Sequence, residues 1–436
     1  MRTWPLLIAC RSNNSGAQDS AFSLARGAII CFLVVLPFGH NAALKNIALL
    51  GMLIAAIWLM LRRELTVDWR SPILLALAGF LLVMVVTSSS GVDPSESFGE
   101  LRKHFLPGLL LFLLIPTTFR SEYLTRLLLA VIALAFMVRT GLTLIELACY
   151  FPDVSAGRSE GSFIKGFSLD AGLYVPVMVG LLLLGGSWRW LAPAGLLAIV
   201  AGMLLVQSRT PVAAAVVAIA AMLFFLRKWR LLAGSLTVFF ASATLIGITQ
   251  PEIAQRFKIA VSPQTYVKAL DTKQFQLGEG FSGRTPIWFG VLEITKERFW
   301  VGYGFGWKKL GPIALDNGFV ARWAAKSDDL FSAEQARYFS QQSSTVNPHN
   351  LYLQIYFESG ILGLVAYLLM LLTLIVQSAR ISWRGAGLNR VLGAIVFAYL
   401  IDHVILGMFN GLLIGLGPSL ALVALLETVR RSEKCA

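Results

Sequence analysis

The segment LAPAGLLAIVAGMLLVQSRTPVAAAVVAIAAMLFFL, residues 191–226, holds two apolar runs separated by a short polar stretch that contains Ser208 and Arg209. A helix that crosses the hydrocarbon core of a bilayer needs about 20 mostly apolar residues. Each run approaches this length, and the few residues around Arg209 leave room only for a sharp turn. The segment therefore predicts two membrane helices that form a tight hairpin.

The composition of the rest of the chain supports the same interpretation. Of 436 residues, 56% are hydrophobic and only 14% are charged, and the mean hydropathy is +0.71. A soluble domain carries about 25% charged residues, and a soluble chain of this length divides into domains with charged surfaces. The abundance of Leu, Val, Ile and Phe argues against disorder. We therefore predict an all-α polytopic membrane protein.

Apolar segments predict about twelve transmembrane helices, with both termini on the cytoplasmic side. In that orientation the short cytoplasmic segments contain 18 Lys and Arg residues, and the short outer segments contain 6. Positive charge accumulates in cytoplasmic loops, so this ratio decides the orientation. The predicted spans are residues 24–39, 42–61, 71–88, 104–118, 127–149, 167–185, 190–207, 210–226, 231–249, 350–377, 388–406 and 409–428.

One polar region of about 100 residues interrupts the apolar segments and lies on the outer side. A region of this length is too long for a structureless loop, so we expect helices within it, notably at 287–299 and 333–339. It holds 12 basic residues that the orientation rule does not explain, which indicates an anionic substrate. The predicted organisation is a cytoplasmic tail (1–23), nine transmembrane helices (24–249), a large outer segment with helical pieces (250–349), three transmembrane helices (350–428) and a cytoplasmic tail (429–436).

No metal or cofactor motif stands out. The four cysteines are scattered, so neither a disulfide framework nor a CxxC metal site follows from them. Asp328 and Asp329 form an acidic doublet without nearby histidines or further carboxylates. The stretch from Gly302 to Gly306 lacks the strand–turn–helix context of a nucleotide-binding loop. We expect neither a metal nor a cofactor.

Several basic residues lie at the predicted outer face. Arg209 lies between two apolar helices, where an arginine is costly unless it is wetted or paired. It either snorkels or binds an anion, because a guanidinium matches phosphate oxygens bidentately. Arg284 precedes Thr285, a candidate helix cap, and is either a surface arginine or an anion ligand beside the helix N-terminus. Arg158 and Lys165 add two positive charges in a short loop.

The stretch NPHNLYLQIYFESG, residues 347–360, begins the tenth predicted span at its outer end. His349 is one of four histidines, and histidine is the side chain that exchanges a proton near neutral pH. Gln354 and Glu358 follow on one helix face at a spacing of four. His349 is therefore a candidate general base, and the alternative is a structural role at the helix start.

Two further polar pairs lie within predicted spans. Arg139 and Glu146 are two turns apart on one face of the fifth span, so we expect a buried ion pair, with a polar groove as the alternative. Asp402 and His403 lie near the outer end of the eleventh span, where they orient a base or cap a helix.

Four motifs follow one another within residues 190–366. They are Ser208-Arg209-Thr210 with Ala213 to Val217, Gly283-Arg284 with Trp288, the turn from Gly302 to Gly306, and Pro348 to Gln354 with Glu358, Gly360 and Gly363. Together with twelve spans and a large outer segment between the ninth and tenth, this pattern resembles the O-antigen ligase and polymerase superfamily of bacterial envelope proteins. One departure is Phe299-Trp300-Val301, where such proteins often carry a proline.

The resemblance implies a GT-C-type membrane glycosyltransferase in the Gram-negative inner membrane, with its active site on the periplasmic side. A ligase of this kind moves polysaccharide from undecaprenyl diphosphate to a sugar hydroxyl of lipid A–core. His349 would be the general base. Arg284 and Arg209 would hold the diphosphate, with support from Arg158 and Lys165.

The same resemblance assigns further properties. Asn350, Tyr352 and Gln354 are implied to bind substrate. The reaction would invert the anomeric centre without a metal or cofactor. The partners would be the lipid-linked donor, lipid A–core and membrane lipids, with no nucleic acid, and the chain would be a monomer.

Three alternatives stay open. Two belong to the same superfamily, an O-antigen polymerase and a protein O-oligosaccharyltransferase, and the modest length of the chain together with its outer segment favours a ligase. The third is a transporter of an anionic solute. A transporter predicts two matching halves with broken helices near mid-membrane, and the sequence shows no such duplication.

Overall fold

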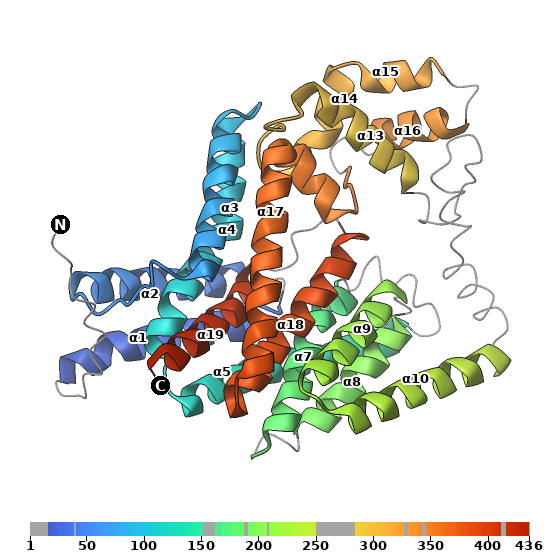
Figure 1. The fold of residues 1–436 in the computed structure, drawn as a ribbon. Helices are drawn as coiled ribbons and strands as arrows, with labels where there is room; N and C mark the ends of the chain where they lie inside the picture. The colour runs from blue at the N-terminus through green and yellow to red at the C-terminus, as the bar shows by residue number, and fades with distance from the viewer. Residues whose placement is uncertain are drawn as a thin grey trace.

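The structure, a computed structural model, is built from helices throughout the residues that it describes (Figure 1). These residues are 16–38, 41–150, 162–164, 166–186, 191–206, 209–249, 284–326, 330–341, 346–410 and 416–435.

The helices follow the chain in three groups. The first group is α1 (Gly16–Val35), α2 (Ala42–Leu61), α3 (Pro72–Ser89), α4 (Pro94–Thr118), α5 (Glu122–Tyr150), α7 (Phe167–Leu184), α8 (Leu191–Leu205), α9 (Arg209–Phe225) and α10 (Trp229–Thr249). The second group is α13 (Thr285–Thr295), η2 (Lys296–Arg298), η3 (Trp307–Lys309), α14 (Leu310–Asp316), α15 (Phe319–Ala324) and α16 (Leu330–Gln341). The third group is α17 (Leu351–Arg384), α18 (Gly387–Gly407) and α19 (Leu416–Cys435).

The predicted spans correspond to these helices one by one, since each of the twelve overlaps a helix of the first or third group. Among the described residues, six helices are long and apolar enough to cross a membrane, namely α2, α3, α5, α7, α17 and α18. Shorter apolar helices occupy Ser20–Val35, Ala192–Met203 and Thr210–Phe225. The chain is therefore a multi-pass membrane protein, while the number of twelve spans stays a prediction.

Apolar side chains cover the outside of the bundle as well as its core. Met52 and Phe80 are buried between helices, whereas Ile47 on α2 and Leu75 on α3 are 65% and 59% exposed. Helices that present apolar residues on every side suit a bilayer, where lipid tails solvate the outer face and all backbone groups pair within the helix.

Helices α13–α16 gather at one end of the bundle, and α17 runs from them along the bundle (Figure 1). They enclose a second apolar core in which Ile287, Val291 and Ile294 of α13 pack with Trp323 and Phe339. These three α13 residues share one face of the helix, as the sequence pattern required. The helices predicted at 287–299 and 333–339 are confirmed by α13 with η2 and by α16.

A turn rich in glycine joins this helical group to α17. Helix α17 is interrupted at Gly360, whose backbone φ of 64° and ψ of −165° suit glycine alone. Tyr303 and Gly304 donate backbone hydrogen bonds to the carbonyl oxygens of Phe357 and Glu358, at 2.9 and 2.8 Å. A Cβ at Gly302 would lie 2.5 Å from the Phe357 oxygen. The glycines thus permit close backbone contact with α17.

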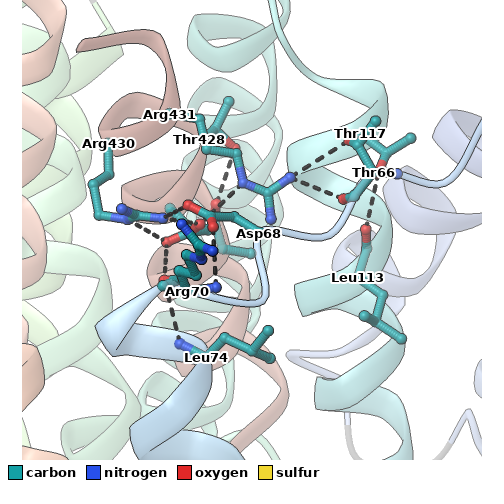
Figure 2. A network of polar contacts seen from close by, with 12 residues as sticks. Thr66, Asp68, Arg70, Leu74, Leu113, Thr117, Thr428, Arg430 and Arg431 are labelled. Atoms are coloured by element: carbon teal, nitrogen blue, oxygen red, sulfur yellow. Dashed lines mark hydrogen bonds and ion pairs between the residues drawn. The ribbon is translucent and has the colours of Figure 1, made fainter. Parts of the chain in front are cut away.

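A polar network holds the opposite end of the bundle together (Figure 2). The carboxylate of Glu427 on α19 is fully buried and accepts hydrogen bonds from Ser71 at 2.7 Å, from Arg430 and from Arg431. Arg430 also pairs with Asp68. The network therefore joins α19 to the loop that precedes α3.

The predicted ion pair within the fifth span is wrong. Arg139 of α5 is buried and pairs with Asp170 of α7. Glu146, also on α5, accepts backbone hydrogen bonds from Ser162, Phe163 and Ile164 at 2.7, 2.8 and 2.9 Å. Spacing along one helix face allowed the pair, but carboxylate and N–H partners from another part of the chain are better placed.

Candidate active site

The segment before α17 presents His349 in an unusual backbone conformation. Its φ is +48°, in the left-handed region that few residues other than glycine and asparagine adopt readily. The backbone N–H of His349 donates to Oδ1 of Asn347 at 2.7 Å. Asn350 then caps α17, because its Oδ1 accepts from the N–H of Leu353 at 3.1 Å. Two asparagine side chains therefore fix the backbone on both sides of the imidazole.

Helix α13 braces this segment from the side. The indole N–H of Trp288 donates to the carbonyl oxygen of Pro348 at 2.9 Å. At the start of the same helix, Nη1 of Arg284 donates to the carbonyl oxygen of Phe409, just beyond α18, at 2.6 Å. Residues from three distant parts of the chain thus meet around His349.

The electrostatic environment of His349 and Arg284 is also unusual. Burial and the nearby Arg284 guanidinium lower the pKa of His349 to about 4, so the imidazole is neutral at neutral pH. Burial also lowers the pKa of Arg284, which stays protonated as guanidinium does in proteins. Within the described residues Arg284 forms no ion pair with a carboxylate. The site therefore combines a neutral base with a half-buried cation that no carboxylate in the described part of the chain neutralises.

The start of α13 differs in one detail from the prediction. Arg284, not Thr285, is the residue before the first helical turn, and no side chain caps the helix there. Thr285 is the first helical residue and is buried, and its hydroxyl has no hydrogen-bond partner among the described residues. The predicted threonine cap is wrong, and the N-terminal N–H groups of α13 keep their favourable field for an anion.

The sequence model of the O-antigen ligase family matches residues 194–368. These residues are therefore similar to an O-antigen ligase domain. The match runs from α8 across the helical group α13–α16 into α17, so it includes Arg209, Arg284 and His349. No curated protein matches the chain.

Three of the predicted substrate-binding residues in the matched region have partners within the protein. The hydroxyl of Tyr352 donates to the carbonyl oxygen of Val404 on α18 at 3.0 Å. Gln354 is 2% exposed and donates from Nε2 to Oε1 of Glu358 at 3.0 Å. Asn350 caps α17. These contacts give each residue a structural role in holding the site.

The structure brings only part of the predicted cationic group together. Arg209 is the first residue of α9, and its side chain lies outside the described part of the chain. Arg158 and Lys165 also lie outside the described residues. Arg284 is thus the described cation of the matched region that lies beside His349.

The structure contradicts one of the two roles that the sequence suggested for Asp402 and His403, which is to cap a helix. Both are buried within α18, more than a turn from either end, so they do not cap a helix. His403 contacts the hydroxyl of Tyr367 through Nε2 at 2.6 Å. The Asp402 carboxylate packs against Gly172, where an added Cβ would lie 1.9 Å from it.

Trp288 and Phe409 are the functional contacts that sequence reasoning missed. Trp288 belonged to a motif, but nothing in the motif indicated that its indole reaches the Pro348 carbonyl. Phe409 contributes only a backbone oxygen, and any residue at that position offers the same group. Neither contact has a signal in the sequence.

Proposed function

We propose that this protein is an O-antigen ligase that transfers polysaccharide from undecaprenyl diphosphate to a sugar hydroxyl of lipid A–core. The observation that carries the proposal is the neutral His349 beside Arg284, within the part of the chain that matches the O-antigen ligase family. The reaction would take place at the periplasmic face of the Gram-negative inner membrane, in a GT-C-type fold.

The reaction is a direct displacement. His349 accepts the proton of the acceptor hydroxyl as its oxygen attacks the anomeric carbon of the donor. The bond from that carbon to the diphosphate oxygen breaks, and its electron pair leaves with the lipid diphosphate. Attack opposite the leaving group inverts the anomeric centre. The developing charge on the diphosphate is stabilised by Arg284 and Arg209, with Arg158 and Lys165 in support, and no metal takes part.

Donor binding also prepares the base. In the free protein the pKa of His349, about 4, makes the imidazole a weak base at neutral pH. A diphosphate bound at Arg284 offsets the guanidinium charge that depresses this pKa. An opposite charge within about 4–6 Å shifts a pKa by about 1–3 units, so donor binding moves His349 towards the pH at which a general base is most effective.

The test is a reconstituted reaction with purified lipid-linked donor and lipid A–core. His349→Asn is the informative variant, because asparagine accepts the left-handed backbone of this position but cannot take up the proton. We expect a loss of transfer of at least about 100-fold, the lower end of general-base contributions, with the donor still bound. Full transfer by this variant overturns the role of His349.

The diphosphate clamp has its own measurement. Arg284→Ala should weaken binding of the lipid-linked donor, whereas Arg337→Ala should not, because Arg337 is exposed and pairs with Glu334 on α16. Unchanged donor affinity in Arg284→Ala contradicts the clamp. Accumulation of long lipid-linked polymer in cells that lack the protein distinguishes a ligase from a polymerase.

A further inference from the structure

A pocket lies beside the N-terminal part of α17, between α17, α4 and the glycine turn. Its walls come from the first turns of α4, from the glycine turn with η3, and from α17. Glu96 and Glu100 contribute from α4, Phe305 and Trp307 from the turn, and Gln354 and Glu358 from α17. None of the roles in the proposed displacement uses this pocket.

Two buried side chains in the pocket have unmet hydrogen-bonding capacity. Glu358 is 0% exposed and Gln354 is 2% exposed, and they share one hydrogen bond, from Gln354 Nε2 to Glu358 Oε1. The backbone of Gly306 also interacts with the Glu358 carboxylate, but among the described residues Oε2 of Glu358 and Oε1 of Gln354 have no hydrogen-bond partner of normal geometry. Leaving such oxygens buried without a donor is unfavourable, so a native protein normally supplies a partner.

The walls indicate what kind of partner would fit. Two unmet acceptors and the further carboxylates of Glu96 and Glu100 call for a ligand with several hydroxyl donors. Trp307 adds a flat apolar surface, which suits the C–H face of a sugar ring, whereas the ring of Phe305 is buried. Among the described residues no three His, Cys, Asp or Glu side chains are grouped as metal ligands, so a cation is a poorer candidate.

Charge separates this pocket from the site around His349. Three carboxylates line it together with the cation Lys308 and with His104, whereas the charge next to the imidazole is that of Arg284. Lys309, buried nearby, donates to Oγ of Ser97 at 2.6 Å and to the Phe305 carbonyl oxygen at 2.8 Å. The carboxylates outnumber the lysine of the lining and accept hydroxyl groups, so an uncharged part of a saccharide fits here better than a diphosphate.

We infer that the pocket formed by Glu96, Glu100, Trp307, Gln354 and Glu358 is a subsite for the hydroxyl groups of an uncharged sugar residue of a transferase substrate. The inference rests on the proposed function for its substrate class. Gln354 and Glu358 follow His349 on α17 within three turns, so a sugar held here lies within one or two sugar lengths of the base. The bound sugar belongs either to the acceptor core or to the repeat unit of the donor.

Glu100→Gln tests the subsite in the reconstituted reaction. We expect the KM for one saccharide substrate to rise about tenfold, the effect of one charge-assisted hydrogen bond, with little change in kcat. A rise in the KM for lipid A–core places the acceptor sugar in the pocket, and a rise in the KM for the lipid-linked donor places the donor sugar there. If neither KM changes, the subsite is overturned.

Glu334→Gln is the matched control. Glu100 pairs with Lys103 at 2.7 Å and Glu334 pairs with Arg337 at 2.6 Å, both three residues apart on a helix, and the two glutamates are 20% and 17% exposed. The control loses the same kind of ion pair away from the pocket. Equal changes in KM for both variants identify a general structural effect and overturn the subsite.

A binding measurement separates this inference from the proposed function. The probe is core oligosaccharide freed of lipid and phosphate, observed by saturation-transfer NMR with the purified wild-type protein, Glu100→Gln and Trp307→Ala. Binding by the wild type that both substitutions weaken supports the subsite even if no transfer is detected. Transfer by a wild type that shows no saccharide binding, with KM values insensitive to Glu100→Gln, overturns the subsite and leaves the ligase function intact.

Discussion

Replacing Gly360 with alanine should detach the glycine turn from α17. A Cβ at this position would lie 2.3 Å from the carbonyl carbon and oxygen of Trp300 and 2.5 Å from the backbone nitrogen of Val301. All three atoms belong to the backbone, so no side-chain rotation relieves the contact. The φ of 64° with ψ of −165° adds strain for any residue that has a Cβ.

The expected loss of stability is the sum of the backbone strain and of the hydrogen bonds that are lost. The backbone conformation costs about 1–3 kcal/mol in a residue other than glycine. Separating the two segments loses backbone hydrogen bonds from Ile361 to Phe299, from Leu362 to Trp300 and from the turn to α17, four in all. At about 0.5–1.5 kcal/mol each, the total is roughly 3–9 kcal/mol, a large share of the stability of an ordinary domain.

The assay is the thermal midpoint of the detergent-purified protein, followed by the fraction that remains monodisperse after heating. Gly79→Ala is the control, because Gly79 lies in a regular part of α3 with no atom within 4 Å of an added Cβ. We expect Gly360→Ala to melt far below both the control and the wild type, or to accumulate poorly. Equal midpoints for the two alanine variants would refute the reasoning.

Four further predictions concern other parts of the protein. Because the pKa of His349 is about 4 when folded and about 6.5 when unfolded, the unfolded state binds more protons between these values, and stability should fall as pH drops from about 6.5 to 4. As pH falls, kcat should decline at a higher pH than kcat/KM does, because donor binding raises the pKa of His349. Glu427→Gln should lower stability by about 3 kcal/mol, because it leaves Arg430 and Arg431 short of a buried partner. Trp288→Phe should lower kcat about fivefold through the lost bond to Pro348.

Three of these predictions have a control variant. His349→Asn should lose the pH dependence of stability near pH 5, and an unchanged profile contradicts the assignment. Glu122→Gln removes an exposed ion pair with Arg126 and should change stability by less than about 1 kcal/mol. Trp323→Phe removes an indole bond to Glu293 away from His349, so an equal loss of kcat would show that Trp288 acts through stability alone.

Hydropathy was sufficient to locate the helices, because a bilayer requires long apolar segments that satisfy their own backbone. All twelve predicted spans overlap helices, and the pattern at Ile287, Val291 and Ile294 predicted the buried face of α13 correctly. Arg139 shows where local periodicity fails. A residue seven positions away was a plausible partner on one helix, but Asp170 on another helix was closer in space.

The candidate site, too, was predictable from the sequence only in part. The residue types of His349 and Arg284 indicated a base and an anion ligand, and the structure places them together. It also shows that Gln354 and Tyr352 have protein partners, which their position in a motif did not reveal. The pocket with Glu96 and Glu100 had no sequence signal, because its walls come from segments more than 200 residues apart.

The sequence by itself determined that the chain is helical, crosses a membrane several times and carries an isolated histidine and basic residues where its longest polar segment meets a helix. These are consequences of side-chain chemistry and of order along the chain. Only the tertiary structure decided that Arg284 depresses the pKa of His349 and that Glu358 faces a pocket with an unmet oxygen. Burial and proximity decide both, and they depend on how distant segments pack.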